Sequence, residues 1–101
     1  MLKIEKTMGN GVLRVALEGR LDTTTAPQLE SELKAALGET EKLVLDLQGL
    51  EYISSAGLRV LLSAQKLMAK KGGMTLRHVS EPIMEIFEVT GFVDILEIET
   101  V

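Results

Sequence analysis

Residues 43–69 of this sequence, LVLDLQGLEYISSAGLRVLLSAQKLMA, change from a strand-like to a helix-like pattern. The stretch opens with the mostly apolar run Leu43–Leu47, and near-continuous apolar runs are typical of buried parallel strands. From Leu58 onward, apolar residues recur at helical spacing, which predicts an amphipathic helix. The sequence therefore places Ser54 and Ser55 where a buried strand leads into the N-terminus of a helix.

The segment that joins the predicted strand to the helix is short. Gln48–Glu51 is expected to form a turn or connector, because Gly49 is a residue that commonly interrupts regular structure. Tyr52 and Ile53 then bring the chain back toward the core.

The two serines have two interpretations. The first turn of a helix has free N–H groups and the positive end of the helix dipole, so it favours both a capping hydroxyl and an anion. Serine is among the most common N-caps, and on the residues alone this structural role is favoured. The alternative is a phosphoacceptor, whose phosphoryl group would add negative charge and three strong acceptor oxygens. Both roles can hold for the pair, with one serine capping and the other accepting phosphate.

Outside this stretch, strand-like segments alternate with helix-like segments. Alternating or apolar runs predict strands, and amphipathic runs bounded by capping residues and glycine predict helices. Thr25 and Gln28 match a capping box, and Ser80 is the expected N-cap of the third helix. The predicted elements are strands at 1–7 and 12–18 joined by a turn at 9–11, a helix between Thr25 and Gly38, the strand and helix described above, a strand at 74–79, a helix between Ser80 and Gly91, and a short strand or helix at 93–98.

This order, β-β-α-β-α-β-α with a possible short final element, predicts a protein of the α/β class. Strands that alternate with helices imply a partly parallel sheet covered by helices. We expect one domain, residues 1–101, whose mixed and mostly parallel sheet of four to five strands opens with a β-hairpin.

The composition narrows the possible functions. The chain has 101 residues, no cysteine and a net charge of −4, which excludes thiol chemistry and argues against a nucleic-acid partner. Only three residues are aromatic, so a base-stacking surface is not expected either. The sequence has no secretory signal pattern and no apolar run of membrane-spanning length, so we expect a cytoplasmic protein without membrane insertion. We expect no metal and no cofactor.

Three further residues could contribute to a site. His78, the only histidine, is predicted to lie in a strand, and a structural or surface role is favoured over catalysis. Asp22 and Asp46 are expected near the C-terminal ends of strands, where open α/β sheets bind ligands, although each is more simply a turn or cap residue. Together with Ser55 they would surround one spot. Phosphate-loop, dinucleotide, hydrolase and zinc-protease motifs do not occur, so an enzyme is not expected.

Several segments together resemble one family. They are Gly19–Asp22 followed by the Thr-Ala-Pro start of a helix, Leu45–Leu47, and above all Tyr52–Leu58. On these residues the chain resembles the STAS domain, specifically the stand-alone bacterial anti-sigma factor antagonists, over essentially its whole length.

The resemblance implies a partner-switching protein that is not an enzyme. The unphosphorylated antagonist would bind an anti-sigma factor that is also a serine kinase, which frees a sigma factor. The kinase would phosphorylate Ser55, with Ser54 as the alternative site, and a PP2C-type phosphatase would reverse the reaction. The expected partner-binding residues are Asp22, Thr23, Ser54, Ser55, Ala56, Gly57 and Arg59. We expect a monomer or weak dimer.

A second function from the same family stays open. Some STAS domains are adaptor subunits of lipid-transport or stress-signalling complexes. An adaptor would use the same helix face without a phosphate cycle, so changes of charge at Ser55 would not alter its binding.

Overall fold

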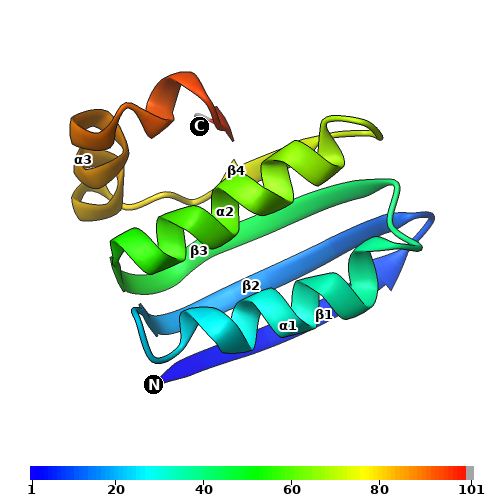
Figure 1. Cartoon of the computed structure of the whole chain (residues 1–101), viewed down its shortest axis with the longest axis horizontal. Helices are drawn as coiled ribbons and strands as arrows, with labels where there is room; N and C mark the ends of the chain where they lie inside the picture. The colour runs from blue at the N-terminus through cyan, green and yellow to red at the C-terminus, as the bar shows by residue number, and fades with distance from the viewer. Residues whose placement is uncertain (100–101) are drawn as a thin grey trace.

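The computed structural model, which describes residues 1–99, has one mixed sheet with helices packed against it (Figure 1). The elements are β1 (Leu2–Gly9), β2 (Val12–Leu21), α1 (Ala26–Leu37), β3 (Lys42–Ile53), α2 (Ser55–Met68), β4 (Met74–Arg77), α3 (Glu81–Thr90), the 3-10 helix η1 (Phe92–Asp94) and β5 (Glu97–Ile98). The predicted order of strands and helices is confirmed. The final segment, for which strand and helix were both open, contains one short element of each kind.

The described part of the sheet has five strands in the spatial order β1-β2-β3-β4-β5. β1 and β2 are antiparallel, whereas each later neighbour in the sheet is parallel. Asn10 and Gly11 join the first two strands, with φ angles of 54° and 79° that suit a tight hairpin turn. The predicted mixed, mostly parallel sheet that opens with a hairpin is therefore confirmed.

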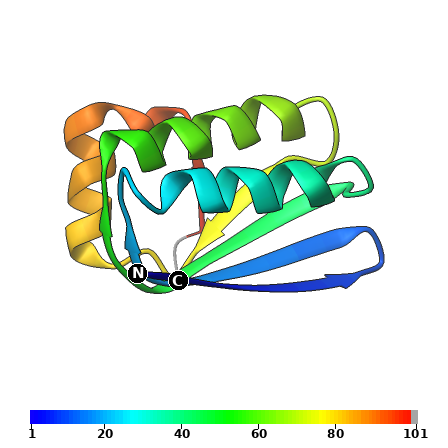
Figure 2. The same cartoon turned by 60° about the horizontal axis from the view of Figure 1, so that its bottom comes forward.

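The helices lie on one face of the sheet and at one end of it. α1 and α2 run side by side across one face, and the opposite face is open (Figure 2). α3 packs against β3 at the end of the sheet where β2 and β3 finish. The largest fully buried side chains form the core between these layers: Leu17, Leu21, Leu29, Leu43, Leu45, Leu47, Leu61, Met68, Met74, Leu76, Ile83 and Phe87.

β3 is longer than the sequence predicted, because residues 48–53 continue the strand. Its pairing with β2 shifts register near Ala16 and again near Gly19, and each shift gives β3 one extra residue. Bulges of this kind bend a strand without ending it. The turn or connector predicted at 48–51 is therefore wrong, and Gly49 lies within the strand.

Two side-chain caps expected from the sequence are not formed. Thr25 occupies the N-cap position of α1, but its hydroxyl donates to the carbonyl oxygen of Arg20 at 2.8 Å. Ser80 occupies the N-cap position of α3 and also makes no side-chain capping bond. The capping box of Thr25 and Gln28 is thus wrong in its bonding, although both helices begin where their N-caps were placed.

Candidate functional site

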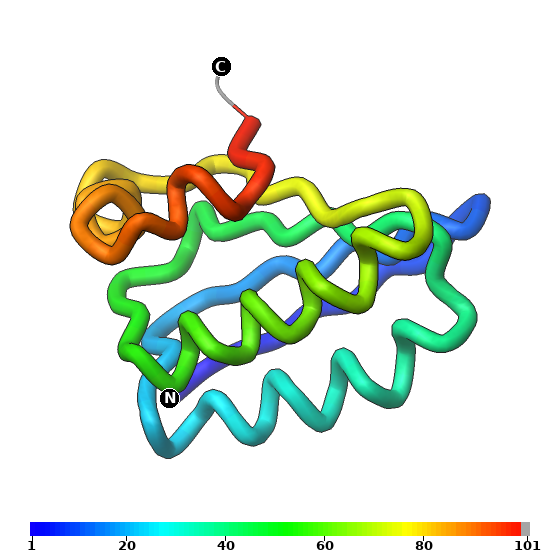
Figure 3. The backbone as a smooth tube through the Cα atoms, turned by 45° about the horizontal axis from the view of Figure 1, so that its top comes forward, coloured from blue at the N-terminus to red at the C-terminus, as the bar shows by residue number. Residues whose placement is uncertain are grey.

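The candidate site lies at the end of the sheet where β2 leads into α1 and β3 leads into α2 (Figure 3). The backbone N–H of Ser54 donates to the carbonyl oxygen of Leu21 at 2.9 Å, so the two connections are held side by side. The N-terminus reaches the same end, because the N–H of Arg20 donates to the carbonyl oxygen of Met1 at 3.1 Å. This is the end of the sheet at which the parallel strands β2 and β3 have their C-termini, and α/β sheets usually bind ligands there.

The geometry gives the two serines different roles. Ser54 is the N-cap of α2, in extended backbone conformation, and its Oγ accepts a hydrogen bond from the N–H of Gly57 at 3.3 Å. Ser55 is the first residue of the helix, and its side chain is exposed. One hydroxyl therefore caps the helix while the other faces solvent beside the positive end of the helix dipole.

Gly57 allows the first turn of α2 to pack closely against the sheet. It is buried, and a Cβ atom at this position would lie 2.7 Å from Cγ of Leu21 and 2.9 Å from Cγ1 of Ile53. Real Cβ atoms essentially never make contacts that short. The glycine is thus required by close approach, because any side chain would lift the serine-bearing turn from the ends of β2 and β3. Ala56 beside it is half-buried.

Asp22 organises the connection from β2 to α1. Its Oδ1 accepts hydrogen bonds from the hydroxyl of Thr24 at 2.7 Å, the N–H of Thr24 at 3.0 Å and the N–H of Thr25 at 3.1 Å. These donors, the Thr24 hydroxyl first, lower the pKa of Asp22 from its usual 3.8 to about 2. Asp22 is therefore a fixed carboxylate near neutral pH. Thr23, between these residues, is exposed.

Two residues that the sequence argument did not assign to the site belong to this end of the sheet. Arg20 and Tyr52 are neighbours on adjacent strands, and the guanidinium carbon lies 4.4 Å from the centroid of the Tyr52 ring. Arg20 Nε is also 4.0 Å from Oδ2 of Asp22. Both residues lie within the segments that carried the family resemblance. The sequence signal was only that both residues occur in these segments, because their contact depends on the pairing of β2 with β3.

Arg59, the last of the predicted partner-binding residues, lies four residues after Ser55 and is exposed. Residues at this spacing are neighbours on a helix surface. The structure thus brings Asp22, Thr23, Ser54, Ser55, Ala56, Gly57 and Arg59 to one end of the molecule, on the first turns of α2 and the adjacent loop.

Asp46 does not join this group, so the predicted cluster of Asp22, Asp46 and Ser55 is wrong. It lies inside β3, opposite Ala16. Because an extended strand rises roughly 3.3 Å per residue, it is roughly 20 Å before the end of β3. The prediction failed because it ended the strand too early.

Asp46 instead contacts its own strand and the residue that follows the C-terminal end of β4. Its Oδ1 is 3.0 Å from Nδ1 of His78 and accepts from the N–H of Gln48 at 3.0 Å. His78 is not in the strand as predicted, because β4 ends at Arg77 and His78 adopts a left-handed φ of 55°.

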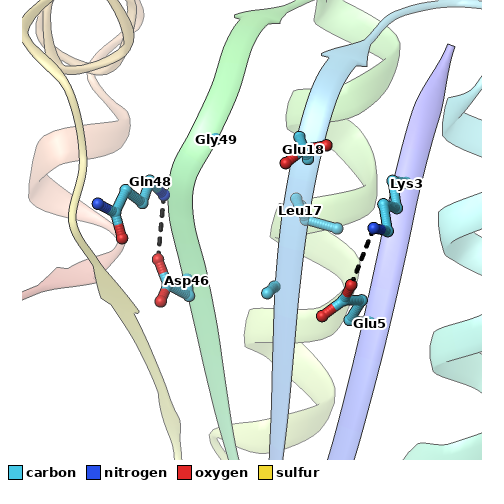
Figure 4. Close-up of a pocket in the computed structure, with 8 residues that line it drawn as sticks. Lys3, Glu5, Leu17, Glu18, Asp46, Gln48 and Gly49 are labelled. Atoms are coloured by element: carbon cyan, nitrogen blue, oxygen red, sulfur yellow. Dashed lines mark hydrogen bonds and ion pairs between the residues drawn. The ribbon is translucent and has the colours of Figure 1, made fainter.

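The open face of the sheet contains a hollow of about 370 Å³ (Figure 4). Asp46, Gln48 and Gly49 line one side of it, and the ion pair of Lys3 with Glu5 lines the other. Among residues 1–99 no group of three metal-ligating side chains is found, and no helix there is long and apolar enough to cross a membrane. The hollow is lined by both charges and offers no evident nucleophile, so the serine end is the stronger candidate.

Comparison with known proteins identifies the family of this chain. A family model described as "Mlab, STAS domain" matches residues 5–97. BtrV of Bordetella bronchiseptica is 39% identical over 99 residues, covering 96% of this chain and 85% of the relative. The anti-sigma F factor antagonist of Paenibacillus polymyxa is 34% identical over 100 residues, covering 96% of this chain and 86% of the relative.

Solved structures share the same fold. An anti-sigma factor antagonist from Mycobacterium paratuberculosis gives a TM-score of 0.90 at 24% identity, covering 100% of this chain and 87% of that one. SpoIIAA, a Bacillus cell fate determinant, in its phosphorylated form gives a TM-score of 0.75 at 18% identity, covering 97% of this chain and 92% of that one.

The five-stranded sheet, its helix-covered face and the serine-capped start of α2 define a STAS domain. The chain belongs to the STAS family, among relatives that include anti-sigma factor antagonists.

Proposed function

We propose that this protein is an anti-sigma factor antagonist that is switched off by phosphorylation of Ser55. The observation that supports this site best is the difference between the two serines. Ser54 uses its hydroxyl to cap α2, whereas Ser55 is exposed at the first helical position. A kinase can therefore reach Ser55 without breaking the cap.

In this proposal, unphosphorylated Ser55 lies within the surface that binds an anti-sigma factor, and that binding releases a sigma factor. The anti-sigma factor, acting as a serine kinase, transfers the γ-phosphoryl group of ATP to Oγ of Ser55; ADP leaves and the hydroxyl proton is released. A PP2C-type phosphatase hydrolyses the phosphate ester and restores the hydroxyl. This chain, the anti-sigma factor, the sigma factor and the phosphatase all act in the cytoplasm, where this chain is a monomer or weak dimer.

The physical basis of the switch is charge. A phosphoserine carries about −1.5 to −2 charges at neutral pH. The N-terminus of α2 tolerates an added anion, so the fold does not have to change. A partner that covers the site must instead desolvate the phosphate, and Asp22 already supplies a nearby negative charge. A loss of about 1.4 kcal/mol lowers affinity tenfold, so a modest penalty is enough to exchange partners.

The test is phosphorylation by candidate anti-sigma factor kinases with ATP and Mg²⁺, followed by intact-mass measurement and site mapping. We expect one phosphoryl group that is lost in Ser55→Ala. Ser63→Ala is the matched control, because Ser63 is exposed further along the same helix. If the phosphoryl group is lost only in Ser54→Ala, the phosphorylation site is Ser54 rather than Ser55.

The adaptor function predicts a different result. An adaptor would bind through the same face of α2, which includes the exposed Ser55 and Arg59, without a phosphate cycle. In that case no candidate kinase modifies the chain, and Ser55→Ala and Ser55→Asp bind the partner equally well. The switch requires that Ser55→Asp binds more weakly.

A further inference from the structure

The C-terminal part of the chain holds all of its excess negative charge. All 11 lysine and arginine residues precede residue 78, together with nine of the 15 acidic residues, so residues 1–77 carry a net charge of +2. Residues 78–101 contain six acidic residues and one neutral histidine, so their net charge is −6. A charge asymmetry of this size within one chain indicates a segment that interacts with a partner of opposite charge.

Helix α3 exposes three of these acidic residues in one row, which we call the acidic row. Glu81, Glu85 and Glu88 are exposed, and they follow one another at spacings of four and three residues. Side chains at these spacings are neighbours on a helix surface. The salt bridges formed within residues 1–99 include none of the three. Their charge is therefore available to a partner.

The acidic row is unfavourable for α3 itself. Like charges three or four residues apart on a helix repel each other. Glu88 also lies in the last turn, which contains no basic residue and is the negative end of the helix dipole. Residues that are unfavourable for their own element are expected mainly at functional sites. The acidic row therefore indicates a surface that contacts a partner.

An apolar stripe runs beside the acidic row. Val89 is 86% exposed and lies one helical turn after Glu85. The core side of α3 is formed by Ile83 and Phe87, which are fully buried, so Val89 contributes nothing to the core. The residues that line a shallow hollow on the outer side of the helix are Pro82, Glu85, Ile86, Val89 and Thr90. The outer face of α3 thus combines negative charge with exposed apolar surface.

This face lies at the same end of the molecule as the start of α2 (Figures 1 and 2). α3 packs against β3, the strand that ends at Ile53, directly before the two serines. A stable protein interface buries roughly 800 Å² on each partner and uses about 20–30 residues a side. The first turn of α2 and the loop at Asp22 provide fewer residues than that. A partner that covers Ser55 therefore extends over neighbouring elements, and α3 is one of them.

We propose that the outer face of α3 is a docking surface for a basic, partly apolar segment of the anti-sigma factor. This inference rests on the proposed function and names the chemistry of the partner. Lysine or arginine side chains of that segment pair with Glu85 and Glu88, and its apolar side chains cover Val89. Charge complementarity favours a basic occupant over a neutral or acidic one, and its cations also relieve the repulsion within the acidic row.

Docking at α3 is separate from the switch at Ser55. The acidic row carries the same charge before and after phosphoryl transfer, so it contributes equally to the bound substrate and to the transition state. Loss of such uniform binding raises KM and leaves kcat unchanged. In this arrangement α3 holds the chain on the kinase, whereas the phosphate on Ser55 decides whether the complex persists.

The test measures binding to the anti-sigma factor at about 50 mM and about 300 mM salt, together with the kinetics of Ser55 phosphorylation. At the lower salt, Glu85→Lys and Glu88→Lys should each weaken binding about tenfold, and Val89→Ser about fivefold. KM should rise by the same factors while kcat stays unchanged. The salt dependence of binding should fall in the two lysine variants.

Glu39→Lys is the matched control. Glu39 is exposed in the loop that follows the C-terminal end of α1, whereas the candidate site lies at the other end of that helix. Its substitution changes the net charge equally and should alter affinity less than about twofold. Glu85→Lys should also raise Tm by a few degrees, because it replaces two repulsions along α3 with attractions. Weaker binding by a variant with a raised Tm does not come from loss of the fold.

The outcomes separate this inference from the proposed function. If the unphosphorylated wild-type chain binds no anti-sigma factor, the proposed function fails and the inference fails with it. If the wild type binds but Glu85→Lys and Glu88→Lys behave like Glu39→Lys, only the inference is overturned. A lower kcat with an unchanged KM in these variants would overturn it as well, because α3 would then act on the transfer step rather than on docking.

Discussion

The close packing around Gly57 allows a quantitative prediction about the stability of α2, the helix that carries Ser55. In Gly57→Ala, the new methyl group would lie 2.7 Å from Cγ and 3.0 Å from Cδ2 of Leu21, and 2.9 Å from Cγ1 of Ile53. All three of these atoms belong to buried side chains at the ends of β2 and β3. The clash can be relieved only if these side chains or the first turn of α2 move.

Two effects of opposite sign decide the stability of this variant. Overpacking a filled core typically costs about 1–3 kcal/mol. Alanine is better than glycine inside a helix by up to about 1 kcal/mol. We therefore expect a net loss of about 1–2 kcal/mol, which lowers Tm by roughly 4–16 °C in a domain of this size. The movement should also lengthen the bond from the N–H of Gly57 to Ser54, which is already 3.3 Å.

Gly38→Ala is the matched control for this experiment. Gly38 follows α1 with an ordinary helical φ of −60°, and no atom lies within 4 Å of a Cβ placed there. The same substitution should raise stability by about 0.4–1 kcal/mol, because it reduces the freedom of the unfolded chain. Thermal and urea unfolding measure both changes. If Gly57→Ala is as stable as Gly38→Ala, the close-packing argument is wrong.

Three other predictions concern single side chains near the helix ends. NMR titration should give Asp22 a pKa of about 2. Because this folded value lies below the usual 3.8, the Asp22 carboxylate stabilises the fold fully above about pH 3.8, and this contribution is lost as the pH falls through about 2. Ser54→Ala should destabilise the fold by about 1 kcal/mol in urea unfolding, whereas Ser55→Ala should be nearly neutral. Lys71→Met removes an ammonium group that donates to the carbonyl oxygens of Leu37 at 2.6 Å and Thr40 at 3.0 Å. The free energy of unfolding should therefore fall by about 1 kcal/mol, which lowers Tm by several degrees.

The parts of the fold that could be predicted from the sequence are those set by local periodicity. The apolar run from Leu43 and the helical pattern after Ser55 both correspond to real elements, because each pattern reflects which residues face the core. Ser54 and Ser55 could be placed at the helix start for the same reason. The residues alone did not decide which hydroxyl caps the helix, since that depends on the backbone angles of the cap, and Ser55 was chosen only through the family resemblance.

The features that could not be predicted depend on pairing between distant residues. Gly49 looks like a break in sequence, yet the neighbouring strand keeps it in the sheet through two bulges. That error also misplaced Asp46, whose distance from Ser55 follows from the length of β3. The stack of Arg20 on Tyr52 likewise exists only because β2 and β3 align these residues. The hydrophobic pattern sets which face of a strand a residue occupies, but it did not reveal the two bulges that align Arg20 with Tyr52.

The hydrogen bonds at the site favour a switch that changes charge rather than shape. The turn at Asp22 is held by three donors, Ser54 is bound both to β2 and to its own helix, and Gly57 has no space to move. Groups restrained in this way have no second arrangement of similar energy, which a conformational switch requires. In the proposed switch, a phosphoryl group on Ser55 would meet a fixed scaffold, so the change that a partner would detect is the added negative charge at the start of α2.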